Sequence, residues 1–313
     1  MAVCGIDLGG TKCLALLFED RQVVGEQRLP TPGTAEALVD VLTGVVQGLG
    51  DTLTVQAVGI GAPGLVDREG VLRVAPNLAA AEGMSIRSVL EGALGLPVVV
   101  DNDATCAAWG EAQLGAARGC GDVVMVTLGT GIGGGIVTGG RIDRGANGFA
   151  GEVGHMVVDP RGPRCPCGQR GCWERFASGS GLGRLAREAA HAGSIGRVVE
   201  LAGGDPENVR GEHLTTAVAE GDGPAIEVLG RFACCLALGL VNLANIFDPA
   251  AFVVGGGLVG AGEALLAPTR AAFAELLGGA ARRPPIAIVA AELGERSGAL
   301  GAALMAAGTV AAR

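Results

Sequence analysis

The first apolar positions of the chain come in short runs that are separated by a glycine-rich turn and a charged tip. Residues 3–24 read VCGIDLGGTKCLALLFEDRQVV, which predicts three strands with the glycine-rich turn between the first two. Residues 123–142 read VVMVTLGTGIGGGIVTGGRI and repeat the order of strand, glycine-rich turn, strand, glycine turn and short strand. This self-similarity indicates a duplication, with a glycine-crowded hairpin at the start of each half.

Helical periodicity alternates with apolar runs in the rest of the chain. Between the hairpins, the pattern predicts helices at 34–50, 85–95 and 104–116 and strands at 55–61 and 97–101. Beyond the second hairpin it predicts helices near 179–202, 212–220, 223–246 and 295–308, strands at 250–254 and 286–290, and a helix between these two strands. Such alternation indicates layers of α and β structure.

A chain of 313 residues is long enough for two domains. We expect a smaller α/β domain over 1–117, a larger one over 118–294, and a C-terminal helix over 295–313 that packs back on the smaller domain. The stretch LGAARGCGD is loop-like, so we expect a hinge near 114–120.

The charge balance and the cysteines narrow the class of protein. The net charge is −9 and there is no basic run, which argues against nucleic acid or an anionic membrane as a partner. The uncharged stretch 232–247 is shorter than the roughly 20 apolar residues of a membrane span, so we expect a buried helix there. No signal peptide is recognisable, and six of the nine cysteines are scattered among apolar neighbours, as expected for reduced, buried thiols in a cytoplasmic protein.

Three cysteines and a histidine lie close together in residues 155–174, HMVVDPRGPRCPCGQRGCWE. Cys165, Cys167, Cys172 and His155 form a complete tetrahedral ligand set for Zn²⁺, with no position left for a substrate water. The sequence therefore favours a structural zinc over a disulfide or unpaired thiols. Glu152 and Glu174 flank this segment and are candidate ligand-binding groups.

The two glycine-rich turns, at 7–12 and 127–135, are candidate phosphate sites because glycine lets backbone N–H groups approach a polyanion. Neither turn matches a P-loop or a dinucleotide fingerprint. A carboxylate at Asp7 would repel phosphate unless a cation lies between them, which implies Mg²⁺. Lys12 is the only lysine of the chain and suits a phosphate contact, although a tight hairpin with an exposed lysine is the alternative.

A third glycine cluster follows the apolar run AFVV and suits close approach to an adenosine. The candidate nucleotide-binding residues are accordingly Asp7, Gly9, Gly10, Thr11, Lys12, Thr130, Gly131, Gly255, Gly256 and Gly257.

Polar residues also end the strand that precedes the helix at 104–116. Asn102 and Asp103 stand where an open α/β sheet places its ligand crevice, and a carboxylate there can accept a hydroxyl proton. The alternative is that Asp103 only caps the helix. Gly64 and Asn77 lie in two further turns and are candidate contacts to a polyol, or parts of ordinary turns.

These motifs together resemble the ROK family of repressors, open reading frames and sugar kinases. The resemblance rests on DLGGTK, NDA (102–104), TLGTGIGGG, GEVGH (151–155), CPCGQRGCWE (165–174) and LGERSGALGAA (293–303), which span almost the whole chain. It is strongest to the glucokinases of high-GC Gram-positive bacteria, in which CWE, ASG and DP…FVVGGGL also occur.

The resemblance implies an actin-like ATPase fold (ribonuclease H-like), with two α/β domains and a cleft between them. It implies that ATP with Mg²⁺ phosphorylates the 6-hydroxyl of a hexose, with glucose as the first candidate. Separately from the resemblance, we expect a homodimer or homotetramer. Asp103 would be the general base and Asn102 a sugar ligand, while Glu152, His155 and Glu174 would hold other sugar hydroxyls. His155 would then use one ring nitrogen for zinc and the other for sugar.

Alternatives remain for the acceptor and for the class of protein. Amino sugars, N-acetylglucosamine, N-acetylmannosamine, mannose and fructose are served in this family by nearly the same motifs. A non-catalytic sugar sensor would not need the base Asp103, and a zinc hydrolase would need an open metal position. A family repressor would carry a DNA-binding segment before the first hairpin, where this sequence has six residues before Asp7.

Overall fold

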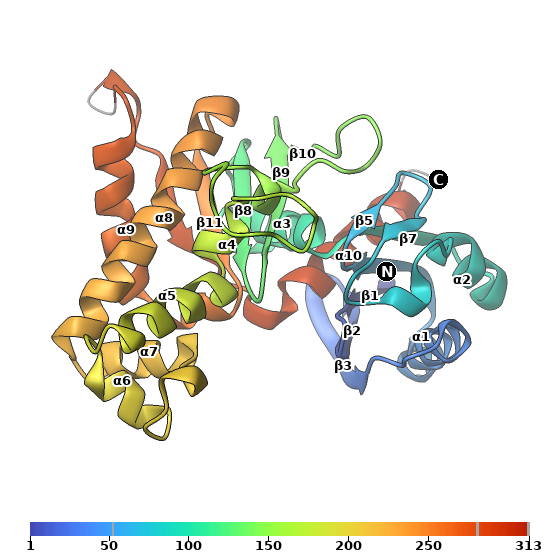
Figure 1. The fold of residues 1–313 in the computed structure, drawn as a ribbon. Helices are drawn as coiled ribbons and strands as arrows, with labels where there is room; N and C mark the ends of the chain where they lie inside the picture. Colours follow the sequence, from blue (N-terminus) through green and yellow to red (C-terminus); the bar gives the residue numbers. More distant parts are fainter. Residues whose placement is uncertain (52, 280–281, 312–313) are drawn as a thin grey trace. The chain divides into compact units, whose positions relative to one another are not determined.

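A computed structural model describes residues 1–51, 53–279 and 282–311 (Figure 1). The chain forms two compact units. The first comprises residues 1–125, 135–151 and 292–313, and the second comprises 126–134 and 152–291. The expected domain ranges and the hinge near 114–120 stay predictions.

The first sheet has the strand order β3-β2-β1-β4-β7 (Figure 1). Its first three strands form an antiparallel meander, and β4 and β7 then add parallel to β1. The bounds are β1 Ala2–Leu8, β2 Lys12–Glu19, β3 Gln22–Pro30, β4 Val55–Ala62 and β7 Val98–Asn102. Because β1, β4 and β7 run in the same direction, their carboxyl ends bring Asp7 and Asp103 to one edge of this sheet.

The second sheet has the order β10-β9-β8-β11-β12, with the same arrangement of strands as the first. The strands are β8 Val123–Leu128, β9 Ile132–Thr138, β10 Arg141–Ile142, β11 Ala251–Gly255 and β12 Ala287–Ala290. The duplication that the two hairpins predicted is thus confirmed by the strand order within the described residues.

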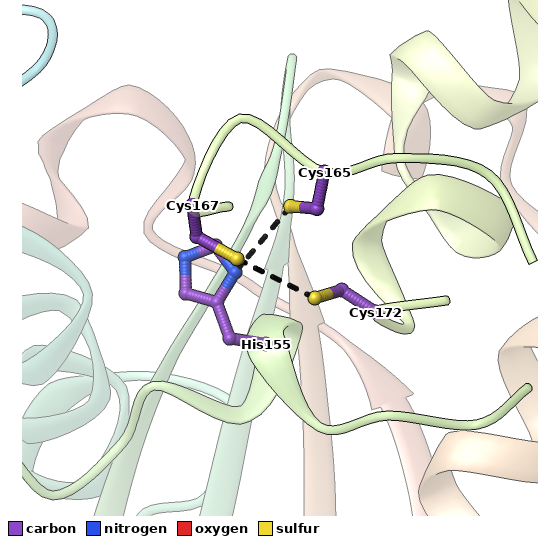
Figure 2. A group of neighbouring side chains, drawn as sticks. All are labelled: His155, Cys165, Cys167 and Cys172. Atoms are coloured by element: carbon purple, nitrogen blue, oxygen red, sulfur yellow. Dashed lines mark hydrogen bonds between the residues drawn. The ribbon is translucent and has the colours of Figure 1, made fainter. Parts of the chain in front are cut away.

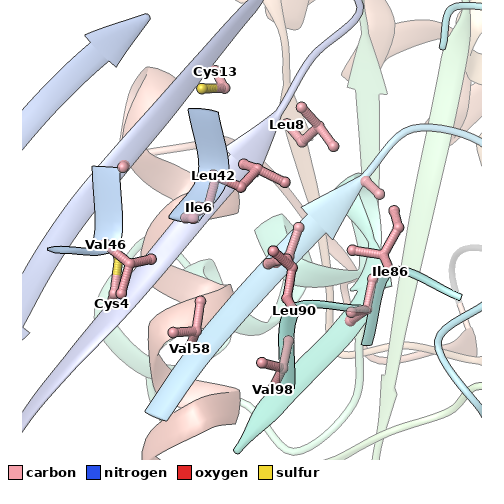
Figure 3. Packing of buried hydrophobic residues seen from close by; sticks show 14 of the residues in the cluster. Cys4, Ile6, Leu8, Cys13, Leu42, Val46, Val58, Ile86, Leu90 and Val98 are labelled. Carbon is pink, nitrogen blue, oxygen red and sulfur yellow. The ribbon is translucent and has the colours of Figure 1, made fainter. Parts of the chain in front are cut away.

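Helices cover both faces of the first sheet. On one face, Ile6 and Val58 pack with Leu42 of α1 (Ala35–Gly50) and Leu90 of α2 (Ile86–Leu94), and Figure 3 shows this cluster. On the other face, α3 (Asp103–Leu114) and α10 (Ser297–Ala311) pack on the strands through small residues. A Cβ on Gly5 or Gly59 would overlap the backbone of α10, so glycine at these positions lets the helix approach the sheet closely.

The second unit is mostly helical, as predicted, but the helix expected at 179–202 is interrupted. It consists of α5 Gly179–His191 and α6 Gly196–Leu201, separated at Gly193, which has a φ of +71°. A residue with that backbone conformation cannot continue a right-handed helix. The other helices are α4 Glu174–Ala177, α7 Gly211–Ala219, α8 Gly223–Phe247 and α9 Glu263–Leu276.

The long helix α8 contains the uncharged stretch that was expected to be buried. Among the described residues it is the one helix whose length and composition would suffice to cross a membrane, and 56% of its most apolar window is buried in the structure. The strand β11 follows it, as the sequence predicted. One expectation about thiols is wrong: Cys234 of α8 is exposed, because it lies on the face of the helix that no other element covers.

The remaining elements are short. The strands β5 Leu65–Val66 and β6 Leu72–Val74 form a two-stranded antiparallel sheet, and 3₁₀ turns lie at Ala79–Ala81, Val153–His155, Pro206–Asn208, Gly257–Ala261 and Gly294–Arg296.

Candidate active site and metal centre

The turn that carries Asn102 and Asp103, here called the acceptor turn, lies where β7 ends and α3 begins. Asn102 is the N-cap of α3, since its Oδ1 accepts a hydrogen bond from Thr105 N at 3.0 Å. Its Nδ2 donates to Gly64 O at 3.1 Å, which joins two of the predicted substrate residues. The alternative role for Asp103 is therefore wrong: Asp103 is the first helical residue rather than the cap, and its Oδ1 accepts from Ala104 N at 2.7 Å.

Asp7 ends β1 close enough to Asp103 for the two carboxyls to interact. Burial, together with the charge of Asp103, raises the pKa of Asp7 to about 7, although Lys12 opposes the shift. The start of α10 closes over this carboxyl, because a Cβ on Gly298 would lie 2.9 Å from Asp7 Cγ. Two neighbouring carboxyls, one of them hard to ionise, form a place where a hard cation would be stabilised.

The first glycine-rich turn, Gly9–Thr11, is held from both sides. Gly9 N donates to Lys12 O at 2.9 Å, and Thr31 Oγ1 donates to Gly9 O at 2.7 Å. Gly10 lies against another predicted turn, since a Cβ there would be 2.7 Å from Asn77 O. A candidate phosphate turn and a candidate polyol turn are thus in direct contact within the first unit.

Lys12 points to a carboxylate in this structure. Its Nζ lies 3.0 Å from Glu295 Oε1, and the second oxygen of Glu295 pairs with Arg28 at 2.5 Å. The Lys12 and Glu295 side chains are 66% and 63% exposed, so this pair contributes little to stability and a bound phosphate can displace it.

The second glycine-rich turn, Gly129–Gly131, is held in a similar way by the start of α5. Ser180 Oγ donates to Thr130 O at 2.8 Å, and Gly179 N donates to Gly129 O at 2.8 Å. The third glycine cluster adjoins this turn, because a Cβ on Gly256 would lie 2.5 Å from Leu128 O. Two of the three predicted nucleotide segments are therefore neighbours within the second unit.

Glu174 connects that turn to the cysteine segment. Its Oε2 accepts from Ile132 N at 3.0 Å, and its Oε1 lies 3.8 Å from Cys165 Sγ. Gly131 provides the room, because a Cβ there would overlap Glu174 Oε2. Glu174, which lies next to the cysteine segment in the sequence, is thus held against a candidate phosphate turn.

The four predicted zinc ligands converge, as Figure 2 shows. Their ligand atoms all lie within 4.8 Å of one another, with Cys167 Sγ 3.6 Å from Cys172 Sγ and Cys165 Sγ 3.8 Å from His155 Nδ1. A tetrahedral Zn²⁺ with bonds of about 2.0–2.3 Å needs ligand atoms roughly 3.3–3.8 Å apart. The donor set fits zinc, and the Cys167–Cys172 and Cys165–His155 separations lie within this range.

The thiols compete for protons when no metal neutralises them. Burial, together with hydrogen bonds to Cys167 and Cys165, raises the pKa of Cys172 to about 12. Burial also opposes ionisation of Cys167, but hydrogen bonds from Gln169 N–H and the other two thiols lower its pKa overall. A divalent cation at this position would replace these shared protons.

His155 presents its two ring nitrogens to different neighbours. Nδ1 faces Cys165, while Nε2 lies 3.9 Å from Glu152 Oε2. Burial raises the pKa of the Glu152 carboxyl, His155 lowers it, and Glu174 raises it again. The orientation leaves Nδ1 for a metal and Nε2 for the side of Glu152.

Trp173 anchors the metal segment between Cys172 and Glu174. Its side chain is fully buried, its Nε1 donates to Cys235 O of α8 at 2.8 Å, and its ring occupies the space above Gly239. A large aromatic ring packed against glycine fixes the backbone on both sides of it.

Two polar residues that sequence reasoning did not assign also hold the first unit together. Asp101 Oδ2 accepts from Arg144 Nε at 2.6 Å, directly before the acceptor turn. Glu111 is fully buried in α3 and accepts from Ala116 N, Glu292 N, Leu293 N and Ser297 Oγ. The signal for Glu111 was a carboxylate among the small and apolar residues in the middle of this helix, where burial requires a partner.

Comparison with known proteins agrees with this geometry. The ROK family model matches residues 3–309. The chain belongs to the ROK family. It is 41% identical over 303 residues to the glucokinase of Streptomyces coelicolor, covering 96% of this chain and 95% of that protein. The actin-like ATPase fold that the resemblance implied is thereby confirmed.

Two further ROK proteins bear on substrate. The structure of a ROK family glucokinase from Streptomyces griseus, in complex with glucose and AMPPNP, matches with a TM-score of 0.87 and 40% identity over 98% of this chain and 100% of that chain. The N-acetylmannosamine kinase of Shigella flexneri is 36% identical over 317 residues, covering 98% of this chain and 99% of that protein.

Proposed function

We propose that this ROK protein is an ATP-dependent sugar kinase that transfers the γ-phosphate to the 6-hydroxyl of glucose. The observation that carries the proposal is its likeness, over essentially both chains, to a glucokinase with glucose and an ATP analogue bound. The acceptor turn provides the chemistry that such a reaction requires, a carboxylate positioned to accept a hydroxyl proton.

We assign the acceptor to the candidate substrate residues that the sequence predicted. Asp103 is the general base that accepts the proton of the 6-hydroxyl. Asn102, held by Gly64 O and Thr105 N, keeps one amide hydrogen and one oxygen lone pair for a sugar hydroxyl. Gly64, Asn77, Glu152, His155 and Glu174 complete the proposed acceptor set. The carboxylates suit sugar hydroxyls because they accept hydrogen bonds from O–H donors.

We assign the nucleotide to the three glycine clusters. The backbone N–H groups of Gly9–Thr11 and Thr130–Gly131 are proposed to bind phosphate oxygens, with Lys12 adding its charge when Glu295 releases it. Gly255–Gly257 is proposed to lie against the adenosine. Mg²⁺ would neutralise the charge between the phosphates and the Asp7 carboxyl, and Asp7 would be its ligand from this chain.

We propose a structural role for zinc at His155, Cys165, Cys167 and Cys172. Four protein ligands saturate a tetrahedral ion, so the metal binds no reacting group. Its role would be to fix the ring plane and tautomer of His155, and with it the direction in which Nε2 faces a sugar hydroxyl.

The state of the protein in the cell follows from the same assignment. We propose a cytoplasmic enzyme that acts on free sugar and ATP, as a homodimer or homotetramer. The exposed apolar side chains of α8, Ile226, Leu238 and Ile246, are the available surface for such association. Light scattering on the purified protein would measure the oligomeric state.

The second candidate is a kinase of N-acetylmannosamine or a related amino sugar. The identity to the Shigella kinase favours it, since 36% is close to the 41% shared with the Streptomyces glucokinase. A fructokinase and a non-catalytic sugar sensor are the remaining alternatives.

The deciding experiment is a coupled ADP-release assay with Mg·ATP and a panel of acceptors. The panel contains glucose, mannose, fructose, glucosamine, N-acetylglucosamine and N-acetylmannosamine, with Asp103→Asn as the inactive control. We expect the highest kcat/KM with glucose. A higher value with an N-acetylhexosamine would replace glucose as the acceptor, and sugar binding without ADP release would indicate a sensor.

A further inference from the structure

A small cavity in the first unit is lined by three arginines. It has a volume of about 220 Å³ and lies between β7, the start of α2, and the segments that carry Asp67 and Gly148. Arg68, Arg87 and Arg144 line it, with Asp67 and Asp101 as the carboxylates. A positive lining is notable in a chain whose net charge is −9.

Both carboxylates of the cavity already have partners. Asp67 accepts from Glu69 N, Val71 N and Arg73 Nε, the last at 2.6 Å, while Asp101 accepts from Asn102 N and Arg144 Nε. Arg73 lies outside the cavity and neutralises Asp67. The charges of Arg68 and Arg87 therefore remain without a carboxylate counterpart in the lining.

The guanidinium groups are held in place but keep free donors. Arg87 Nη2 donates to Arg68 O at 3.0 Å, and its stem packs against Gly70, where a Cβ would lie 2.8 Å from Arg87 Cβ. Arg68 donates to Gly145 O. Each guanidinium has five N–H donors, and the recorded bonds use one from Arg87 and two each from Arg68 and Arg144.

One of these donors is buried without a partner. Arg87 Nε is inaccessible to solvent and has no hydrogen-bond acceptor among the described residues. Because Nε has no solvent-accessible surface and lies against Gly70, an anion in the cavity would reach Arg87 through its Nη donors instead.

The size of the cavity limits what can occupy it. At about 30 Å³ for each water molecule, 220 Å³ corresponds to roughly seven waters, which is room for a tetrahedral oxyanion but not for a nucleotide. A larger cavity of about 550 Å³ shares Asp67 and Arg68 and is lined mainly by apolar groups such as Leu65 and Phe149. An organic substituent on the oxyanion could extend into it.

We propose that this cavity is a binding site for a phosphate-type oxyanion, held by Arg68, Arg87 and Arg144. The site is separate from the glycine-rich turns assigned to ATP. Arg144 also holds Asp101, the residue before Asn102 and Asp103, so an anion that binds Arg144 competes with the support of the acceptor turn.

The test is calorimetric titration of the purified full chain with inorganic phosphate at constant ionic strength. The test variant is Arg87→Gln, which removes one guanidinium charge from the lining and leaves the Asp101 pair untouched. The matched control is Arg231→Gln, which removes the same charge from the exposed face of α8. The titration measures phosphate binding, so its result does not depend on whether the protein is an active kinase.

We expect wild type and Arg231→Gln to bind phosphate equally and Arg87→Gln to bind at least tenfold more weakly. Absence of binding to wild type, or equal binding to Arg87→Gln, would overturn the proposal. If Arg87→Gln does not fold, Arg68→Gln provides the same test on an exposed side chain. Phenyl phosphate distinguishes the ligand: tighter binding than phosphate indicates a phosphomonoester that reaches the larger cavity, and equal binding indicates the inorganic anion.

Discussion

The two glycine-rich turns come from one duplicated pattern, but their surroundings give them different roles. Each joins two antiparallel strands, and a later hydroxyl fixes each one, Thr31 Oγ1 in the first unit and Ser180 Oγ in the second. In each, one glycine lies against a residue that we assign to the sugar: Gly10 against Asn77, and Gly131 against Glu174.

The two turns differ in the side chains that lie beside them. The first turn adjoins the titratable pair Asp7 and Asp103, whereas the second adjoins a carboxylate that the metal segment holds. The repeated backbone thus provides a phosphate-sized turn in each half, whereas the side chains beside the two turns differ and would give them different roles. In the proposed mechanism the first unit would contribute charge and proton transfer, and the second would contribute position.

The largest effect is expected from Asp103→Asn in the first unit. Asparagine keeps the shape of the side chain but cannot accept the proton, so kcat should fall by about 10²–10⁴-fold while sugar binding persists. Steady-state kinetics together with calorimetric titration of the sugar would measure both. The exposed Asp122→Asn is the control, and turnover near wild type in Asp103→Asn would refute the base assignment.

Removing one of the predicted zinc ligands tests whether the metal fixes the position of residues in the second unit. Cys167→Ser is expected to lose zinc and several kcal/mol of unfolding free energy together, because metal binding energy is part of folding energy in such sites. Metal analysis and thermal unfolding would be measured on the same samples. The exposed Cys234→Ser should keep both properties, and a metal-free Cys167→Ser of unchanged stability and activity would contradict a structural zinc.

The Asp7 carboxyl should give the first unit a pH dependence that the second turn lacks. Its pKa is about 7 in the folded protein and near 3.8 in the unfolded chain, so the folded state holds the proton more tightly. The contribution to stability is full below about pH 4 and is lost as the pH rises to 7, by at most about 4 kcal/mol.

Urea unfolding at pH 5 and pH 7.5 would detect this loss. Asp7→Asn should flatten the dependence, and the exposed Asp40→Asn should retain it. Equal slopes in wild type and Asp7→Asn would show that the carboxyl titrates normally.

The smallest effect is expected from a methyl group at the second turn. Gly131→Ala should displace Glu174 from Ile132 N and weaken sugar binding by about tenfold or more, since hydrogen bonds to charged groups contribute about 1.5–3 kcal/mol. Gly129→Ala is the matched control, because a Cβ there meets nothing within 4 Å. Sugar titrations without nucleotide would compare the two, and identical affinities would separate Glu174 from the acceptor site.

Local patterns in the sequence determined the strands, most helices and the candidate metal ligands. Apolar periodicity placed α1 and β4 within one or two residues, because the pattern of buried positions follows directly from helix and strand geometry. The zinc set was readable for a similar reason, since three of its four ligands lie within eight residues of one another. The duplication was visible because both halves keep glycine at the same point of the hairpin.

Only the tertiary structure decided which side chains meet across distant parts of the chain. Asn102 caps α3 in place of Asp103, although either residue type can cap a helix and both stand at its start. The break at Gly193, the four bonds to Glu111 and the arginines around the small cavity were likewise absent from any local pattern. Hydrophobic periodicity reports the burial of a residue against water, whereas hydrogen bonds and charges depend on partners that only the folded chain brings within a few ångströms.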